Sequence, residues 1–153
     1  MKKAKRKAKA MPKIKARAKV KAKPKTKQKF VVSHLREEDF AVNGLRPYAA
    51  YRDLGIGKAT NGMVAAHVIR HAPGTKPEQR VSNRHFHDIQ FQMVYVLKGW
   101  IRSEFEGQGE RLFKAGSCWI QPPRIKHKVL ATSEDMELLE IILPAEFDTV
   151  DVE

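Results

Sequence analysis

Two segments decide the fold: residues 84–100, RHFHDIQFQMVYVLKGW, and residues 116–127, GSCWIQPPRIKH. In the first segment His85 and His87 are two residues apart, so on a β-strand both imidazoles lie on one face. The second segment ends at His127, just after a Pro-Pro pair that favours a tight, extended turn. Three imidazoles can bind one metal ion and leave coordination positions open for a substrate. The sequence therefore predicts a metal site formed by these three histidines.

The spacing of these residues resembles the two sequence motifs of the cupin superfamily. From His85 the chain reads H-x-H-x4-Q-x6-G, and from Gly116 it reads G-x5-P-x-R-x2-H. The family motifs are G-x5-H-x-H-x3 to 4-E-x6-G and G-x5-P-x-G-x2-H-x3-N. The resemblance implies an all-β fold, a double-stranded β-helix of the jelly-roll type, with a barrel over about residues 45–145. It also implies a divalent transition metal (Fe, Mn, Ni or Zn) and, because small cupins are commonly dimers, a homodimer.

Two departures from these motifs affect the chemistry of the site. Gln92 stands where the family has glutamate, and Arg124 stands where it has glycine. An amide carbonyl is a weaker, neutral donor that takes no proton, so with Gln92 as fourth ligand the metal keeps its full double charge. Such a site favours an anionic or chelating substrate. Arg124 either faces solvent or reaches the cavity mouth and pairs with a substrate carboxylate.

Hydrophobic patterning independently favours an all-β barrel or sandwich. Short alternating or β-rich runs are separated by turn residues, and no 3.6-residue periodicity is present. Residues 93–97 are apolar on both faces, so we expect burial against the barrel interior and against either the second sheet or a subunit. The expected strands are residues 48–54, 63–70, 91–97, 100–106, 111–114, 117–121, 127–132 and 136–143.

Such a barrel would enclose an apolar cavity with a few convergent polar groups, which is typical of a small-molecule site. His67 is either a substrate contact in this cavity or an ordinary strand histidine, and we expect His34 and His71 at the surface. Taken singly, each of the three motif histidines could also be structural. We expect the cavity lining to include Val94, Val96, Phe105, Trp119 and Ile141, with Arg124 as a further substrate-pocket candidate.

The positive charge is confined to the N-terminal segment. Residues 1–29 hold 15 Lys and Arg and no acidic residue, whereas residues 30–153 hold 15 basic and 17 acidic residues. We expect a disordered tail over residues 1–29 and one cupin domain over residues 30–153. The tail resembles those of linker histones and could bind nucleic acid with an affinity that falls steeply with salt. A solvated extension, or residues upstream of a start at Met11, is the alternative.

Other features of the sequence limit the binding partners and the cellular compartment of the protein. Residues 30–44 are expected to cover the barrel or to lend a strand to a partner subunit. The single cysteine, Cys118, excludes an intrachain disulfide and is expected to be a buried, inert thiol in a reducing compartment, the cytoplasm. No apolar run reaches the ~20 residues that span a bilayer, and no apolar segment follows the basic N-terminus as in a secretory signal. We therefore expect no membrane partner.

Cupins that use three histidines without the glutamate include ferrous enzymes that oxidise substrates with dioxygen. The resemblance therefore favours a metal-dependent, dioxygenase-type enzyme that acts on a small molecule, with Gln92 as a fourth or supporting donor. The alternative is a non-catalytic module that binds a small molecule or a metal and is tethered to nucleic acid by its tail. A third hypothesis makes the tail the functional part and the barrel a dimerising scaffold.

Overall fold

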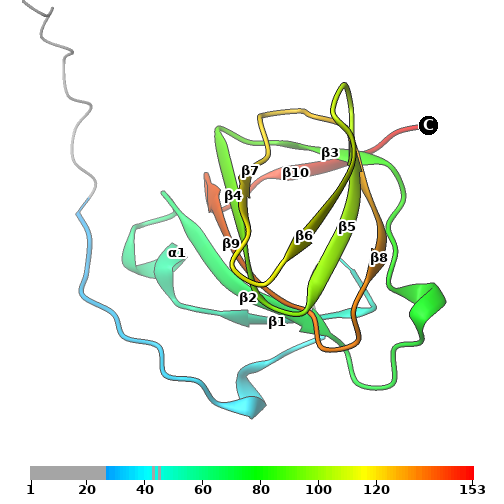
Figure 1. Ribbon diagram of the computed structural model, residues 1–153. Helices are drawn as coiled ribbons and strands as arrows, with labels where there is room; N and C mark the ends of the chain where they lie inside the picture. Colours follow the sequence, from blue (N-terminus) through cyan, green and yellow to red (C-terminus); the bar gives the residue numbers. More distant parts are fainter. Residues whose placement is uncertain (1–26, 43, 45) are drawn as a thin grey trace, which may run out of the picture.

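Turn residues between the apolar runs fold the chain into antiparallel strands that form two five-stranded sheets, seen in Figure 1 as the walls of a barrel. The computed structural model describes residues 27–42, 44 and 46–153. One sheet has the order β1-β2-β9-β4-β7 and the other the order β10-β3-β8-β5-β6. This confirms the expected all-β jelly-roll fold. The tail expected at residues 1–29 lies outside the described residues except for its last three.

The strands follow the expected runs closely. All eight runs form strands with bounds shifted by at most two residues, and two further short strands, β3 and β10, complete the second sheet. The polar strand β10 has little strand propensity of its own and is held by its pairing with β3. The bounds are β1 (Ala49–Asp53), β2 (Ala65–His71), β3 (His85–Asp88), β4 (Phe91–Lys98), β5 (Trp100–Phe105), β6 (Gly109–Lys114), β7 (Cys118–Ile120), β8 (His127–Thr132), β9 (Glu137–Leu143) and β10 (Asp148–Asp151). A short helix, α1 (Ile56–Ala59), joins β1 to β2.

The core lies between the two sheets and uses one face of each strand. Val96 and Ile142 are 0% exposed, and Val94 and Leu138 are almost as deeply buried. In β5 the residues that share one face, Ile101, Ser103 and Phe105, are all buried. At the turn from β4 to β5, Gly99 has φ +66, and a Cβ there would collide with the Ser133 hydroxyl. The motif glycine at this position is therefore required by both backbone conformation and space.

The outer face of the first sheet differs from the expectation. Tyr95 and Leu97 in β4 are 38% and 43% exposed, so within one chain this strand is buried on its inner face only. Cys118 in the edge strand β7 pairs with Tyr95 on that outer face and is exposed. The expectation of a buried thiol was wrong, because the alternation of β7 turns Trp119 inward and Cys118 outward.

The segment before β1 runs along the outside of the barrel (Figure 1). The backbone of Lys29 donates a hydrogen bond to the Ala59 carbonyl, and Ala41 forms an isolated bridge with Tyr51. The Arg70 guanidinium lies 3.6 Å from the centre of the Phe40 ring. Between these contacts a short 3-10 helix spans Glu37–Asp39. The segment therefore covers one edge of the first sheet.

Among the described residues, no helix combines the length and the apolar character that crossing a membrane requires.

Replacing Ile142 by alanine should lower the free energy of unfolding by about 2 to 5 kcal/mol, because the fully buried side chain leaves a cavity. Chemical denaturation measures the change. Val150→Ala, at a position that is 41% exposed, is the control and should change stability by less than about 0.5 kcal/mol. Equal effects of the two substitutions would contradict the described core.

Candidate metal centre

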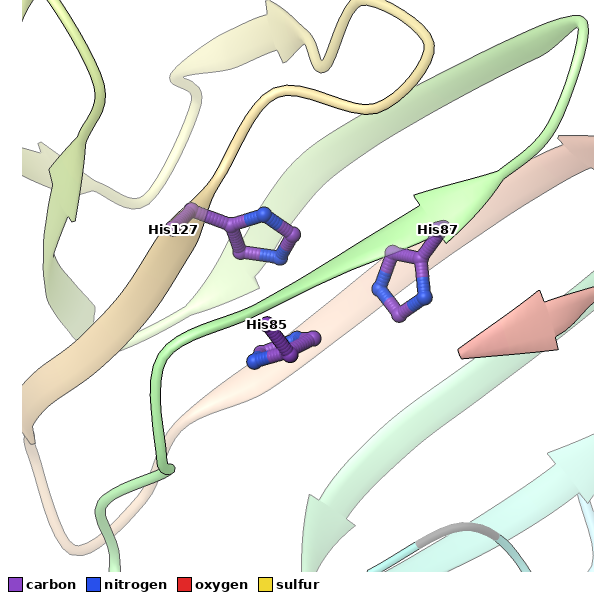
Figure 2. A group of neighbouring side chains, drawn as sticks. All are labelled: His85, His87 and His127. Carbon is purple, nitrogen blue, oxygen red and sulfur yellow. The ribbon is translucent and has the colours of Figure 1, made fainter. Parts of the chain in front are cut away.

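The three motif histidines meet inside the barrel. His85 and His87 project from β3 and His127 from β8, and Figure 2 shows their rings gathered in one place. The register pairs His85 directly with His127 across the two strands. One ring nitrogen from each histidine lies within 4.8 Å of the other two, and the residues are only 1%, 7% and 6% exposed. The three histidines could therefore hold one metal ion.

Backbone carbonyls fix which nitrogen each ring presents. His85 Nδ1 is 2.8 Å from the Asn83 carbonyl oxygen, and His127 Nδ1 is 2.9 Å from that of Ile125. Because a carbonyl oxygen only accepts, both Nδ1 atoms carry the proton and both Nε2 atoms present a lone pair. His87 Nδ1 lies 2.8 Å from the Thr149 hydroxyl, which permits the same tautomer. The rings are therefore oriented as metal ligands before any metal binds.

Burial keeps these imidazoles neutral. The pKa of each of His85, His87 and His127 is lowered to about 4, mainly by loss of solvation and in part by the nearby Arg46 charge. At neutral pH the rings are therefore uncharged, which is the form that binds a metal.

Gln92 lies in a directed chain of hydrogen bonds beside the histidines. The Trp119 indole donates to Gln121 Oε1 (3.2 Å), and the amide nitrogen of Gln121 donates to Gln92 Oε1 (2.9 Å) and to His127 Nε2 (3.2 Å). The amide nitrogen of Gln92 in turn donates to Glu140. Because the indole is only a donor, it sets the orientation of both amides. The Gln92 carbonyl oxygen keeps a second lone pair that a metal could use.

Glu140 in β9 is a buried carboxylate that the sequence analysis missed. Its Oε1 accepts from Gln92, and its Oε2 accepts from His67 Nε2 at 2.6 Å. Burial alone would raise the pKa of Glu140, but the hydrogen bonds from His67 and Gln92, together with the charge of His67, hold this pKa below its ordinary value. The carboxylate that the motif lacks at position 92 is thus present one hydrogen bond away.

The inward residue expected in this strand was Ile141, and that expectation was wrong. Pairing places Glu140 beside His67, whereas Ile141 pairs with Ala66 and Met93 on the opposite face of the sheet. The signal was a lone glutamate between Leu138 and Ile142 in an apolar run, two residues from each and therefore on their face.

A sequence model of the family described as "Cupin domain" matches residues 72–142, which include all three histidines, Gln92 and Glu140. Residues 72–142 of the chain are thus a cupin domain.

Solved structures similar to this cupin share its fold at low identity. The polyketide cyclase RemF from Streptomyces resistomycificus is 16% identical over 80% of this chain and 87% of its own, with a TM-score of 0.60. An RmlC-like cupin from Shewanella frigidimarina is 19% identical over 78% of this chain and 96% of its own, with a TM-score of 0.57. The Lactobacillus farciminis oxalate decarboxylase, a formate complex, is 13% identical over 75% and 34%, with a TM-score of 0.56. A search of curated proteins found no match.

The histidine cluster opens onto a cavity of about 560 Å³ inside this cupin barrel. Three of the expected pocket residues, His67, Val94 and Trp119, line it. Val96 lies instead in the hydrophobic core, and the buried Phe105 ring stacks on His127 with 5.8 Å between ring centres. These two residues therefore support the cavity wall from behind.

Arg124 is placed away from the cavity lining. Its side chain is 61% exposed, lies 3.6 Å from Asp88 and covers the Phe86 ring at 4.5 Å. Of the two alternatives, the structure shows the solvent-facing one. Arg124 has φ +63, the left-handed conformation that glycine adopts without strain, so the turn keeps the backbone shape that the motif glycine provides.

Sequence reasoning missed or misplaced two further residues near the cavity. His71 was expected at the surface, but it lines the cavity, and burial lowers its pKa. Its Nε2 is held by the Ser133 carbonyl at 3.1 Å and the Thr132 hydroxyl at 3.0 Å. Arg46, which follows no sequence periodicity, reaches the metal centre, with Nη2 2.6 Å from His85 Nε2.

The stability of the metal-free protein should fall as pH decreases from about 6.5 to about 4. In this window the unfolded chain protonates histidines whose pKa in the folded chain is about 4, so protons favour unfolding. Denaturation curves recorded between about pH 7 and pH 5 measure the slope. His87→Gln should flatten it, whereas His34→Gln, at an exposed position, should not. An identical slope in His87→Gln would contradict a buried neutral imidazole.

Proposed function

We propose that this cupin is a metal-dependent enzyme that oxidises a small molecule with dioxygen. The observation that carries the proposal is the convergence of three neutral imidazoles, from His85, His87 and His127, beside a cavity whose lining includes His87 and His127. Imidazole ligands suit Fe, Ni, Zn and Cu, and a three-histidine set leaves positions for substrate. When bound, a redox-active metal such as iron would supply the electron transfer that dioxygen chemistry needs.

The surrounding residues have distinct roles in this proposal. Gln92 is the fourth ligand or holds the neighbouring groups in place. The His67 and Glu140 pair, with 2.6 Å between Nε2 and Oε2, provides an acid and a base in the cavity wall that can take up or return a substrate proton. Val94, Leu138 and Trp119 give the cavity apolar surface that excludes water.

The structural neighbours support chemistry on small organic molecules. They include a polyketide cyclase and an oxalate decarboxylase with formate, so the same fold serves different reactions in different proteins. The similarity to these structures shows the fold alone. The proposal of oxidation rests on the candidate metal ligands of this chain.

A non-catalytic binding module is the second candidate, and one observation favours it. Arg46 and Gln121 donate hydrogen bonds to His85 Nε2 and His127 Nε2, so two of the three lone pairs have partners within the protein. In this alternative the basic tail would tether the module to nucleic acid. Residues 1–26 of that tail lie outside the described residues.

Metal analysis and oxygen uptake separate these candidates. Protein purified without a histidine tag should contain one transition metal per chain, and His87→Ala should lose it because one ligand is missing. His34→Ala is the matched control and should keep the metal, since its side chain is exposed. Oxygen uptake is then measured on diketones, phenols, thiols and organic acids.

Uptake with at least one of these substrates, lost in His87→Ala, is the result expected of the enzyme. Stoichiometric metal without uptake on any substrate would favour the binding module instead. Absence of metal from the wild-type protein would contradict the enzyme and would leave the module that binds a small molecule.

We also propose a homodimer that packs through the outer face of the first sheet. Two rows of side chains cross this face, one from Val68 to Cys118 and one from Ala66 to Ile120. Ile120 is 60% exposed and Phe30 in the preceding segment is 95% exposed. A two-fold axis would pair such a face with itself and cover both apolar surfaces.

Light scattering during gel filtration tests the dimer. The wild-type protein should have twice the chain mass of 17.5 kDa, and Tyr95→Glu or Ile120→Glu should give the single-chain mass, because a charge enters the apolar contact. Leu112→Glu is the control, since Leu112 is 53% exposed but lies in β6 of the other sheet. A wild-type monomer would contradict the packing.

We further propose a cytoplasmic location. The single cysteine is exposed and free, and an exposed thiol persists where the cell keeps thiols reduced.

A further inference from the structure

Arg46 is a cation placed directly at the metal centre. It lies in the irregular segment between the Ala41 bridge and β1, and its guanidinium Nη2 is 2.6 Å from His85 Nε2. The residue lines the main cavity and is partly exposed to it. Its charge lowers the pKa of all three histidines, so the guanidinium acts on the whole cluster.

The cavity offers Arg46 no acidic partner. Asp39 pairs with Arg36 at 2.7 Å, and Glu140 accepts from His67 and Gln92. Within the described part of the chain, Arg46 forms no ion pair with any carboxylate. The Arg46 guanidinium faces a neutral imidazole and, at 6.0 Å, the Tyr48 ring. It is poorly compensated, because burial weakens hydration and no anion replaces it.

Metal binding would remove the imidazole as a hydrogen-bond partner of Arg46. The guanidinium N–H donates to the Nε2 lone pair of His85, and this is the lone pair that a metal would use. One lone pair cannot serve both, and two cations repel each other. In the metal-loaded protein Arg46 is therefore a free hydrogen-bond fork beside the metal centre.

We propose that Arg46 binds the acidic group of the substrate, and that the substrate is a small organic acid with an apolar body. This assignment rests on the proposed function, because it takes the metal to be bound by the three histidines. A guanidinium binds a carboxylate through two parallel hydrogen bonds, which fixes orientation as well as charge. Ile69, Val94 and Leu138 line the same cavity and would contact the apolar body.

A competing partner for Arg46 lies in an adjacent hollow. This second cavity, of about 260 Å³, is lined by Arg46 together with Asn83, Thr149 and Asp151. If the displaced guanidinium turned to the Asp151 carboxylate, it would be neutralised within the protein and would not select an anionic substrate. The two possibilities to distinguish are Arg46 bound to the substrate and Arg46 paired with Asp151.

Calorimetry on the zinc-loaded full-length chain makes the distinction without relying on turnover. The probes are mandelate, an aromatic hydroxy acid, and 1-phenylethane-1,2-diol, which is nearly the same shape but uncharged. Wild-type protein should bind mandelate more tightly than the diol. Arg46→Met should weaken mandelate binding about tenfold to hundredfold, the range for one charge-assisted interaction, and leave diol binding unchanged. Arg46→Lys, which keeps the charge but loses the fork, should fall between them.

Zinc affinity is the second readout. Arg46→Met should bind zinc more tightly than wild type, because the competing donor at His85 Nε2 is gone. Arg124→Met is the matched control, since that arginine pairs with Asp88 outside the cavity, and it should change neither measurement.

The possible failures are distinguishable. Zinc binding with equal mandelate affinity in wild type and Arg46→Met would show that Arg46 does not bind the acidic group and would overturn this inference alone. Zinc binding by neither wild type nor Arg46→Met would overturn the proposed function and this inference with it.

Discussion

The site depends on two hydrogen bonds from imidazole to backbone. The carbonyls of Asn83 and Ile125 accept from Nδ1 of His85 and His127, so in both rings the free lone pair is on Nε2. Each carbonyl lies two residues before its histidine, so the geometry is set by the local chain where β3 and β8 begin. Pairing of the two strands then brings the rings together, and burial keeps them neutral. Fold, tautomer and protonation state therefore all favour metal binding.

Charge around this cluster is divided between two opposite groups. Arg46 brings a positive charge to His85, and Glu140 brings a negative charge that reaches the cluster through Gln92. A glutamate ligand at position 92 would cancel part of the metal charge directly. In this protein the carboxylate belongs to Glu140, which is separated from the histidines by Gln92. It therefore compensates part of the positive charge of the site and orients the Gln92 amide. The site can thus keep a strongly charged metal and still position a base in the cavity wall.

The sequence predicted the parts of this site that follow strand alternation, and it missed those set by tertiary pairing. The spacing of His85 and His87 is a strand period, so their shared face could be read directly, whereas His127 was predicted from the resemblance to the second family motif. Ile141 and Glu140 differ by one position, and only the register with β2 decides which faces inward. Arg46 lies in an irregular segment, where no period relates sequence to direction. The left-handed φ of Arg124 could not be predicted from the sequence, because a non-glycine residue occupies the position of the motif glycine.

Anomalous scattering from a crystal of the metal-loaded protein is the most direct test of the three-histidine centre. We expect one peak at about 2.0 to 2.2 Å from Nε2 of each of His85, His87 and His127, as for imidazole ligands. The absorption edge would identify the element. A peak elsewhere in the molecule, or a peak bound through Nδ1, would contradict the account.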